Sequence, residues 1–287
     1  MANLKEIRSR ITSVGSTMQI TSAMKMVSAA KLKRAQDAIT QMRPYANKLT
    51  ELLGSLSASL DTDGGGVYSS QRKINNVLLV TITSNRGLCG GFNASIIKSA
   101  TTLITDKYAD AKVDILSIGK KASEHFRKNK FNLTSSHDEI FNELTFDNIS
   151  KLAEEIMDQF VSEKYDKVLL VYNQFKNAAT QIIMNEGYLP IETVNTDDNI
   201  IGDYLFEPGK KEIVEELIPK SLKTQLFKAI LDSHAAEHGA RMTAMHKATD
   251  NAGELKKDLT LTYNKARQAA ITAEILEIVG GAEALNG

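Results

Sequence analysis

A glycine-rich loop, Ser84 to Asn93, follows the strand-like run "VLLVTIT", a position that often holds phosphate in α/β proteins. A P-loop needs a lysine and a hydroxyl residue directly after its last glycine to bind phosphate and magnesium, and "SNRGLCGGFN" has neither. The dinucleotide fingerprint G-x-G-x-x-G also fails, since Gly87, Gly90 and Gly91 are spaced G-x-x-G-G. The spacing therefore predicts a tight strand-to-helix turn in which one or more glycines take a positive φ.

A second pattern, "HAAEH" from His234 to His238, matches the H-x-x-E-H arrangement in which two histidines share a zinc ion and Glu237 acts as a base. Such a site also needs a third protein ligand and a walled cleft. We expect instead histidines that are solvated or packed in a helix seam.

Two further chemical candidates are weaker. Cys89 has no histidine near it in the sequence to act as a base, so a small buried side chain is expected rather than a nucleophile. The carboxylates of "DEIFNE", residues 138–143, form no recognisable acid–base pair, and a solvated acidic face is expected there.

Composition narrows the classes further. The 287 residues carry no net charge and one cysteine, so no intramolecular disulfide forms. The start of the chain is charged and no run of 18 apolar residues occurs, so neither a signal peptide nor a membrane span is expected. Basic residues dominate residues 1–130 and acidic ones residues 131–219, which indicates either partner surfaces of opposite sign or solvated faces. Aromatic residues do not interleave with the basic ones, which disfavours nucleic-acid binding.

The elements that position these residues begin with a long helix over residues 3–60. Its apolar residues alternate at spacings of three and four, as in a coiled coil. The seam comprises Leu4, Ile7, Ile11, Val14, Met18, Thr21, Lys25, Ser28, Leu32, Ala35, Ile39, Met42, Ala46, Leu49, Leu53, Leu56 and Leu60. Thr21, Lys25 and Ser28 interrupt it, which indicates loosened packing, a fixed register or a surface facing another partner. Pro44 is expected to bend the helix.

Residues 61–73 have the composition of a linker, and residues 74–207 alternate strand-like and helical stretches. "NVLLVTIT", "KVDILSIG" and "DKVLLVYNQF" predict buried parallel strands, and "AATQIIMNEGYLPIE" predicts a half-exposed edge strand. Helices are expected over residues 94–108, 120–130 and 146–165. The middle segment is therefore predicted to be a Rossmann-like α/β domain.

Residues 208–287 predict a second long helix from Ser221 to about Ala284. Its seam comprises Phe227, Leu231, His234, His238, Arg241, Met245, Ala248, Ala252, Leu255, Leu259, Thr262, Ala266, Ala269, Ala273 and Leu276. Two long amphipathic helices at opposite ends of a chain bury their stripes most readily by packing antiparallel. The predicted fold class is α/β, with a long antiparallel coiled coil of the terminal helices and a Rossmann-like domain.

Seven segments in order then carry a family resemblance: "KEIRSRI", "QITSAMKMVSAAKLKRAQ", "RPYA", "SNRGLCGGFN", "YLFEP", "ARMTAMHKATDNAGEL" and "YNKARQAAITAEILEIVGGAEAL". Together they resemble the gamma subunit of the rotary F-type ATP synthase. The resemblance implies a central-stalk rotor that transmits torque between the membrane c-ring and the catalytic alpha/beta hexamer. It implies no catalytic residue, cofactor or metal, partners that include the epsilon subunit, and a peripheral position on the cytoplasmic face of the bacterial inner membrane.

The same resemblance suggests roles for individual residues. Contacts to the beta subunit are implied for Met24, Lys25, Lys31, Arg34, Arg267, Gln268 and Thr272. Contacts to the c-ring and epsilon subunit are implied for Tyr204 and Glu207. A nucleotide-dependent enzyme built on the α/β domain and a static coiled-coil scaffold are the alternatives.

Overall fold

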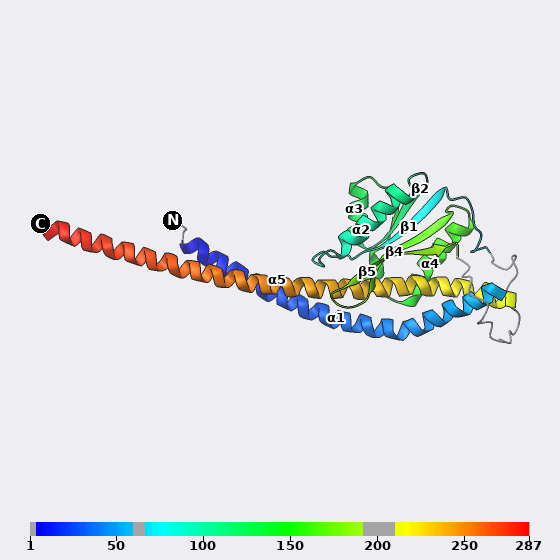
Figure 1. The fold of residues 1–287 in the computed structure, drawn as a ribbon, viewed down its shortest axis with the longest axis horizontal. Coiled ribbons are helices and arrows are strands. Elements are labelled where there is room, and N and C mark those ends of the chain that lie inside the picture. The colour runs from blue at the N-terminus through cyan, green and yellow to red at the C-terminus, as the bar shows by residue number, and fades with distance from the viewer. Residues whose placement is uncertain (1–3, 60–66, 192–209, 287) are drawn as a thin grey trace. The chain divides into compact units, whose positions relative to one another are not determined.

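The computed structural model describes residues 4–59, 67–191 and 210–286 and divides the chain into two compact units. Unit 1 comprises residues 1–28 and 242–287, and unit 2 comprises residues 29–241. Two helices contribute to both units, α1 (Leu4–Ser59) and α5 (Lys210–Asn286) (Figure 1).

Unit 1 is a pair of helical segments that run antiparallel. The Thr21 and Thr249 hydroxyl oxygens lie 2.8 Å apart, and the Lys256 ammonium lies 3.7 Å from the point that a Cβ on Gly15 would occupy. Residue numbers fall along α1 as they rise along α5, which confirms the predicted antiparallel pairing within this unit.

The predicted seam of α1 is confirmed over its described part. Every seam side chain from Leu4 to Leu49 is buried or half-buried. Thr21 and Ser28 are buried rather than turned to another partner, and the Thr21–Thr249 contact favours the register-fixing interpretation of the interruption. The side chains of Leu53 and Leu56, and the whole of Leu60, lie outside the described part. The helix continues through Pro44 without a break.

The predicted seam of α5 needs several corrections. Leu255 and Thr262 are exposed while their neighbours Lys256 and Tyr263 are half-buried, because a helix with 3.6 residues per turn drifts from a strict heptad repeat. Ala269, Ala273 and Leu276 are also exposed, as is every described side chain from residue 267 to 283. The antiparallel pairing brings the start of α1 opposite the turns of α5 just before these positions, so α1 offers them no partner.

The start of α5 also differs from the expectation. The helix begins at Lys210, well before Ser221, and Pro219 lies inside it. Because proline usually ends a helix, the sequence predicted a start at Ser221, after "LIPKSL". Along the described range, no helix is long and apolar enough to cross a membrane.

Unit 2 contains a five-stranded sheet. Its strands are β1 (Asn76–Ile82), β2 (Lys112–Ile118), β3 (Leu133–Ser136), β4 (Lys167–Phe175) and β5 (Gln181–Leu189), in the order β3-β2-β1-β4-β5. All neighbours pair parallel except β4 and β5, which are antiparallel. The predicted strands and the edge position of β5 are confirmed, and the strand order is that of a Rossmann-like sheet. The polar strand β3 was missed because "LTSS" has no apolar period.

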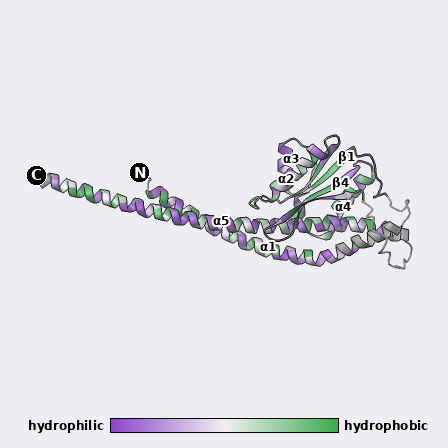
Figure 2. Ribbon diagram, in the orientation of Figure 1, coloured by the Kyte–Doolittle hydropathy of each residue, from purple (hydrophilic) through white to green (hydrophobic). Residues whose placement is uncertain are grey.

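Helices cover both faces of this sheet. The helical segments are α2 (Phe92–Thr102), the π turn η1 (Leu103–Lys107), α3 (Lys120–Lys128), the 3₁₀ turn η2 (Asp138–Asn142) and α4 (Phe146–Val161). On one face, Val77 and Leu79 of β1 pack with Tyr108, which directly follows η1. On the other face, Leu78 and Val80 belong to a core shared with α4 and α5. Because both faces of β1 and β4 are covered, most residues of these strands are apolar, as their hydrophobic colouring in Figure 2 shows.

Candidate interaction surfaces

The glycine-rich loop, residues 84–91, is organised by its own polar side chains. The backbone N–H of Ser84 donates to Asn93 Oδ1 at 3.0 Å, and the Ser84 hydroxyl donates to the Arg86 carbonyl at 2.6 Å. The Asn93 amide donates to the Cys89 sulfur at 3.2 Å. These bonds join the end of β1 to the first turn of α2, so the loop is a compact strand-to-helix turn, as predicted.

Positive φ angles occur at two positions of this loop. Gly90 has φ +61°, which confirms the expectation for at least one glycine. Leu88 has the same φ and is 66% exposed. A left-handed leucine was not predictable from the sequence, where the glycines on either side are the usual left-handed residues.

The crevice in which a Rossmann-like sheet would bind a ligand is filled by α5. Such ligands lie beyond the carboxyl ends of the strands where the strand order reverses, here the ends of β1 and β4. Arg241 of α5 donates to the carbonyls of Arg86 and Gly87, at 2.9 and 3.3 Å. A Cβ on Gly239 would lie 3.2 Å from the Cα of Ala178, which follows β4. The chain's own helix therefore occupies the place of a nucleotide.

The charge that α5 brings to the loop is balanced locally. Arg241 also donates to Glu237 at 2.6 Å, and both side chains are buried. Burial raises the pKa of the Glu237 carboxyl, and the nearby Arg241 guanidinium opposes that rise. Glu237 is bonded to Arg241, and Arg241 is bonded to the loop as well, which leaves neither side chain free for acid–base chemistry.

The histidines of "HAAEH" lie inside unit 2 and not in solvent. The Nε2 atoms of His234 and His238 are 3.1 Å apart, and His238 is 5% exposed. Within the residues that the structure covers, no group of three or more histidine, cysteine, aspartate or glutamate side chains is placed to hold a metal ion. The structure therefore supports histidines packed in the seam of the helix rather than histidines that bind zinc.

Cys89 is buried, as expected. The side-chain groups that contact its sulfur are the Ser84 hydroxyl at 3.8 Å and the Asn93 amide, and neither is a base. In "DEIFNE", Glu139 and Glu143 are exposed, in agreement with a solvated acidic face, whereas Asp138 is half-buried and accepts a hydrogen bond from the Ser136 hydroxyl at 2.8 Å.

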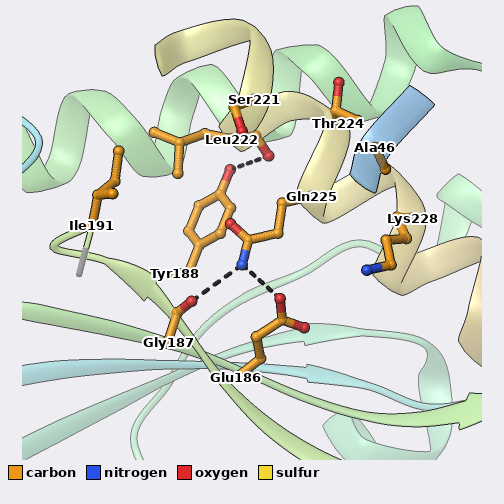
Figure 3. Close-up of a pocket in the computed structure, with 10 residues that line it drawn as sticks. All are labelled: Ala46, Glu186, Gly187, Tyr188, Ile191, Ser221, Leu222, Thr224, Gln225 and Lys228. Atoms are coloured by element: carbon orange, nitrogen blue, oxygen red, sulfur yellow. Dashed lines mark hydrogen bonds between the residues drawn. The ribbon is translucent and has the colours of Figure 1, made fainter. Parts of the chain in front are cut away.

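A cavity of about 300 Å³ lies between β5, α5 and α1 (Figure 3). Three of its polar side chains, Gln225, Glu186 and Tyr188, are hydrogen-bonded, whereas the buried Thr224 hydroxyl has no partner in the described part of the chain. The Gln225 amide donates to Glu186 Oε1 at 2.8 Å and to the Gly187 carbonyl at 3.2 Å, and the Tyr172 hydroxyl donates to Glu186 Oε2 at 2.6 Å. With both of its carboxylate oxygens engaged, Glu186 resembles a structural acid rather than a catalytic one.

The residues that resemblance links to beta-subunit contacts fall into two groups. On α1, Met24 and Lys25 are half-buried, and Lys31 and Arg34 are exposed. On α5, the residues are all exposed and comprise Arg267, Gln268 and Thr272. Thr272 donates to the Gln268 carbonyl of its own helix at 2.9 Å.

Unit 1 contains Met24 and Lys25 of the first group and all of the second, and it does not bring the two sets together. Thr21 lies opposite Thr249, so Met24 and Lys25 lie many turns along α5 from Arg267. Tyr204 and Glu207 lie outside the described residues.

Comparisons with known proteins agree with this arrangement. The family model described as "ATP synthase" matches residues 3–285. The ATP synthase gamma chain of Christiangramia forsetii is 62% identical over 287 residues, and that of Flavobacterium johnsoniae is 64% identical over 288, each alignment covering 100% of both chains.

Solved structures share the fold at lower identity. A chain of the Euglena gracilis mitochondrial ATP synthase rotor has a TM-score of 0.69 and 22% identity, covering 93% of this chain and 98% of that one. A chain of the Tetrahymena thermophila mitochondrial ATP synthase central stalk and c-ring has a TM-score of 0.60 and 24% identity, covering 80% and 99%. With a family match along almost the whole sequence and full-length relatives above 60% identity, this chain belongs to the ATP synthase gamma-chain family.

Proposed function

We propose that this chain is the central-stalk rotor subunit of an F-type ATP synthase. It transmits torque between the membrane c-ring and the catalytic alpha/beta hexamer during proton-driven ATP synthesis or ATP hydrolysis. Its partners are the alpha, beta and epsilon subunits and the c-ring, and it carries no chemistry of its own. It reaches the membrane only through the complex, on the cytoplasmic face of the bacterial inner membrane.

The observation that carries the proposal is the bare C-terminal part of α5. Large apolar side chains there are strongly exposed: Ile271, Ile275, Leu276, Ile278 and Val279. Exposed apolar surface on an isolated helix is unfavourable in water and marks a place that a partner covers. Ala269, Ala270 and Ala273 precede or lie among these residues, and Gly280 and Gly281 follow them, so part of this surface offers a surrounding sleeve only small side chains.

The absence of chemistry is supported by the α/β domain. Arg241 and Gly239 of α5 lie at the ligand crevice, and the half-buried Glu186 and the buried Glu237 are bonded to neighbouring side chains. The domain is a platform that holds α5 rather than a nucleotide site. This disfavours the enzyme alternative.

The mechanism then follows from population shift. Each beta subunit interconverts between conformers of different nucleotide affinity, and a rotor changes their populations only if it contacts those conformers differently. We assign such contacts to Lys31 and Arg34 for an acidic loop of beta, and to Arg267 and Gln268 nearer the C-terminal end. Met24, Lys25 and Thr272 complete the beta contacts, and Tyr204 and Glu207 meet the c-ring and epsilon subunit.

Cross-linking in the assembled complex tests the proposal. Leu276→Cys, joined by a disulfide to a cysteine introduced in a facing beta subunit, is expected to stop ATP turnover in proportion to the cross-linked fraction. Reduction of the same sample should restore turnover, which serves as the control. A static scaffold predicts equal turnover before and after reduction, and that result would reject the rotor.

A further inference from the structure

The histidine pair on α5 has a geometry that depends on its protonation. His234 and His238 lie one turn apart, with Nε2 atoms 3.1 Å apart, ring centroids 4.5 Å apart and ring planes at 86°. In such a contact one Nε2 carries a hydrogen and donates while the other accepts. Two imidazolium rings would each carry a hydrogen on Nε2, so the contact cannot survive full protonation.

The described residues around the pair provide no hydrogen-bond acceptor for an added proton on His238. His238 is buried, and its Nδ1 has no hydrogen-bond partner. The Phe141 ring of η2 stacks on His234, with centroids 6.1 Å apart and planes at 19°. A proton placed on His238 Nδ1 would therefore be a buried donor without an acceptor, which is costly.

The charged groups around the pair are cationic. Lys31 faces it from α1 and Arg241 from α5, while η2 contributes the neutral Phe141 ring. Glu237 lies next in the chain but is bonded to Arg241. In the described ranges, no carboxylate bonds to either ring. Burial first, and then these cations, lower the pKa of His234 to about 4, and burial, His234 and the same cations lower that of His238 to about 3.

The pair adjoins the contact that seats the glycine-rich loop. Arg241, which donates to the Arg86 and Gly87 carbonyls, lies about one turn beyond His238 on the same helix. Glu237, which bonds to Arg241, directly precedes His238. A shift of this turn that separates the two rings therefore also displaces the Glu237–Arg241 pair from the loop.

We infer that His234 and His238 form an acid-sensitive latch. At neutral pH the neutral pair holds this turn of α5 in the conformation that binds the loop, and acidification towards pH 5 favours opening of the turn. The inference uses contacts within unit 2 alone, so it stands or falls separately from the rotor function.

The direction of the effect follows from linkage. Each histidine has a lower pKa in the folded chain than the ordinary 6.5, so its stabilising contribution is present above pH 6.5 and is lost as the pH falls from 6.5 towards about 4 for His234 and about 3 for His238. Each histidine raises the opening equilibrium constant by up to about tenfold per pH unit in that window. Between pH 7 and pH 5 this gives roughly 20-fold per histidine.

Hydrogen exchange of the full-length chain measures this opening. Peptides covering residues 84–91 and 230–241 are followed at pH 7, 6 and 5, with correction for the intrinsic exchange rates. The wild type is expected to open at least about 20-fold more at pH 5 than at pH 7. The double variant His234→Gln/His238→Gln should show no such rise. His246→Gln is the matched control, since His246 is exposed on the same helix and should leave the wild-type behaviour unchanged.

A flat wild-type profile, or an equal rise in the double variant, would overturn the latch. If the double variant does not fold, nitrogen-15 NMR of the two imidazoles in the wild-type chain decides. Neutral rings at pH 6 with Nε2 protonated in one ring only support the latch, and imidazolium signals from both rings at pH 6 reject it.

Discussion

Arg43→Ala is expected to destabilise unit 2 strongly. Arg43 on α1 donates to Asp232 Oδ1 of α5 at 3.0 Å and to the Phe175 carbonyl of β4 at 3.2 Å. The Asp232 side chain is wholly buried and its Oδ2 has no partner. Arg43 therefore joins three elements through one buried carboxylate.

The expected loss in the free energy of unfolding follows from the buried Asp232 carboxylate that the substitution leaves without its partner. Breaking a buried ion pair by removing one partner costs about 3–5 kcal/mol. The Arg43 side chain is 42% exposed, so solvent already screens part of the attraction and we expect about 2–3 kcal/mol. Protonation of the abandoned carboxyl from its ordinary pKa of 3.8 limits the penalty at pH 7 to roughly 4 kcal/mol.

The pH dependence has a defined sign. Burial already raises the pKa of Asp232, and the hydrogen bond from Arg43 opposes the rise. Loss of Arg43 raises it further, so the variant binds a proton in the folded state that the unfolded chain releases. Its stability deficit should be largest at neutral pH and should shrink as the pH is lowered.

Urea unfolding followed by circular dichroism measures the effect, with Asp232→Asn as the partner substitution in a double-mutant cycle. Asp232→Asn in the Arg43→Ala background should recover about 1 kcal/mol or more, since no charge then stays buried. Lys33→Ala is the control. Its pair with Asp37 has a similar 2.9 Å distance but is exposed, so its loss should cost below about 0.5 kcal/mol. A loss for Arg43→Ala no larger than this control, or no recovery by Asp232→Asn, would refute the reasoning.

Three further outcomes are expected. Gly90→Ala should destabilise by about 1 kcal/mol in urea unfolding because of its positive φ, while Gly91→Ala, at φ −80° with open space around it, should be neutral; equal effects would contradict the assigned strain. Thr21→Val should cost about 0.5–1.5 kcal/mol by removing the buried hydroxyl contact between the helices of unit 1, and an unchanged thermal midpoint would count against a register role. Arg267→Ala should weaken coupling of ATP turnover to proton pumping in the assembled complex without changing the circular dichroism spectrum, whereas the neighbouring exposed Lys265→Ala should leave coupling intact; equal coupling in both variants would remove Arg267 from the contact.

Much of the fold was predictable from periodicity. Strands buried on both faces appear as apolar runs, and this identified β1, β2 and β4 with nearly the observed bounds. The seam of α1 was readable because large apolar residues repeat along it. β3 was not predicted because it is short and mostly polar, and only its hydrogen bonds to β2 identify it as a strand.

The second helix, α5, shows what a periodic sequence pattern does not predict. Small residues at three- and four-residue spacing continue to the end of α5, yet no partner lies against residues 267–283 within the described chain. Periodicity reports that one face is apolar, but it does not report what covers that face. The same limit applies to Leu255, since a short drift in helix phase moves a seam residue to the surface.

For the candidate site, the sequence mainly excluded one activity, the binding of a nucleotide phosphate by the glycine-rich loop. The sequence lacked the lysine and hydroxyl of a phosphate loop, but nothing in it indicated that Arg241, far along the chain, donates to the loop carbonyls. A single arginine in a seam slot carries no signal for such a contact. The spacing of His234 and His238 and their place in the seam were visible in the sequence, but the contact between their Nε2 atoms was not.

The position of α5 links the fold to the function. In a Rossmann-like enzyme the carboxyl ends of β1 and β4 are left open for a ligand, and catalysis depends on that opening. Here Gly239 permits α5 to approach the turn after β4 closely, and Arg241 bonds to the turn after β1, so one helix closes the crevice. A helix fixed at two strand ends is held against rotation relative to the sheet. A subunit that passes torque along α5 requires this helix to be fixed to the α/β domain, and these contacts fix it. Gly239→Val should weaken the contact of α5 with the turn after β4 without changing any residue assigned to a partner.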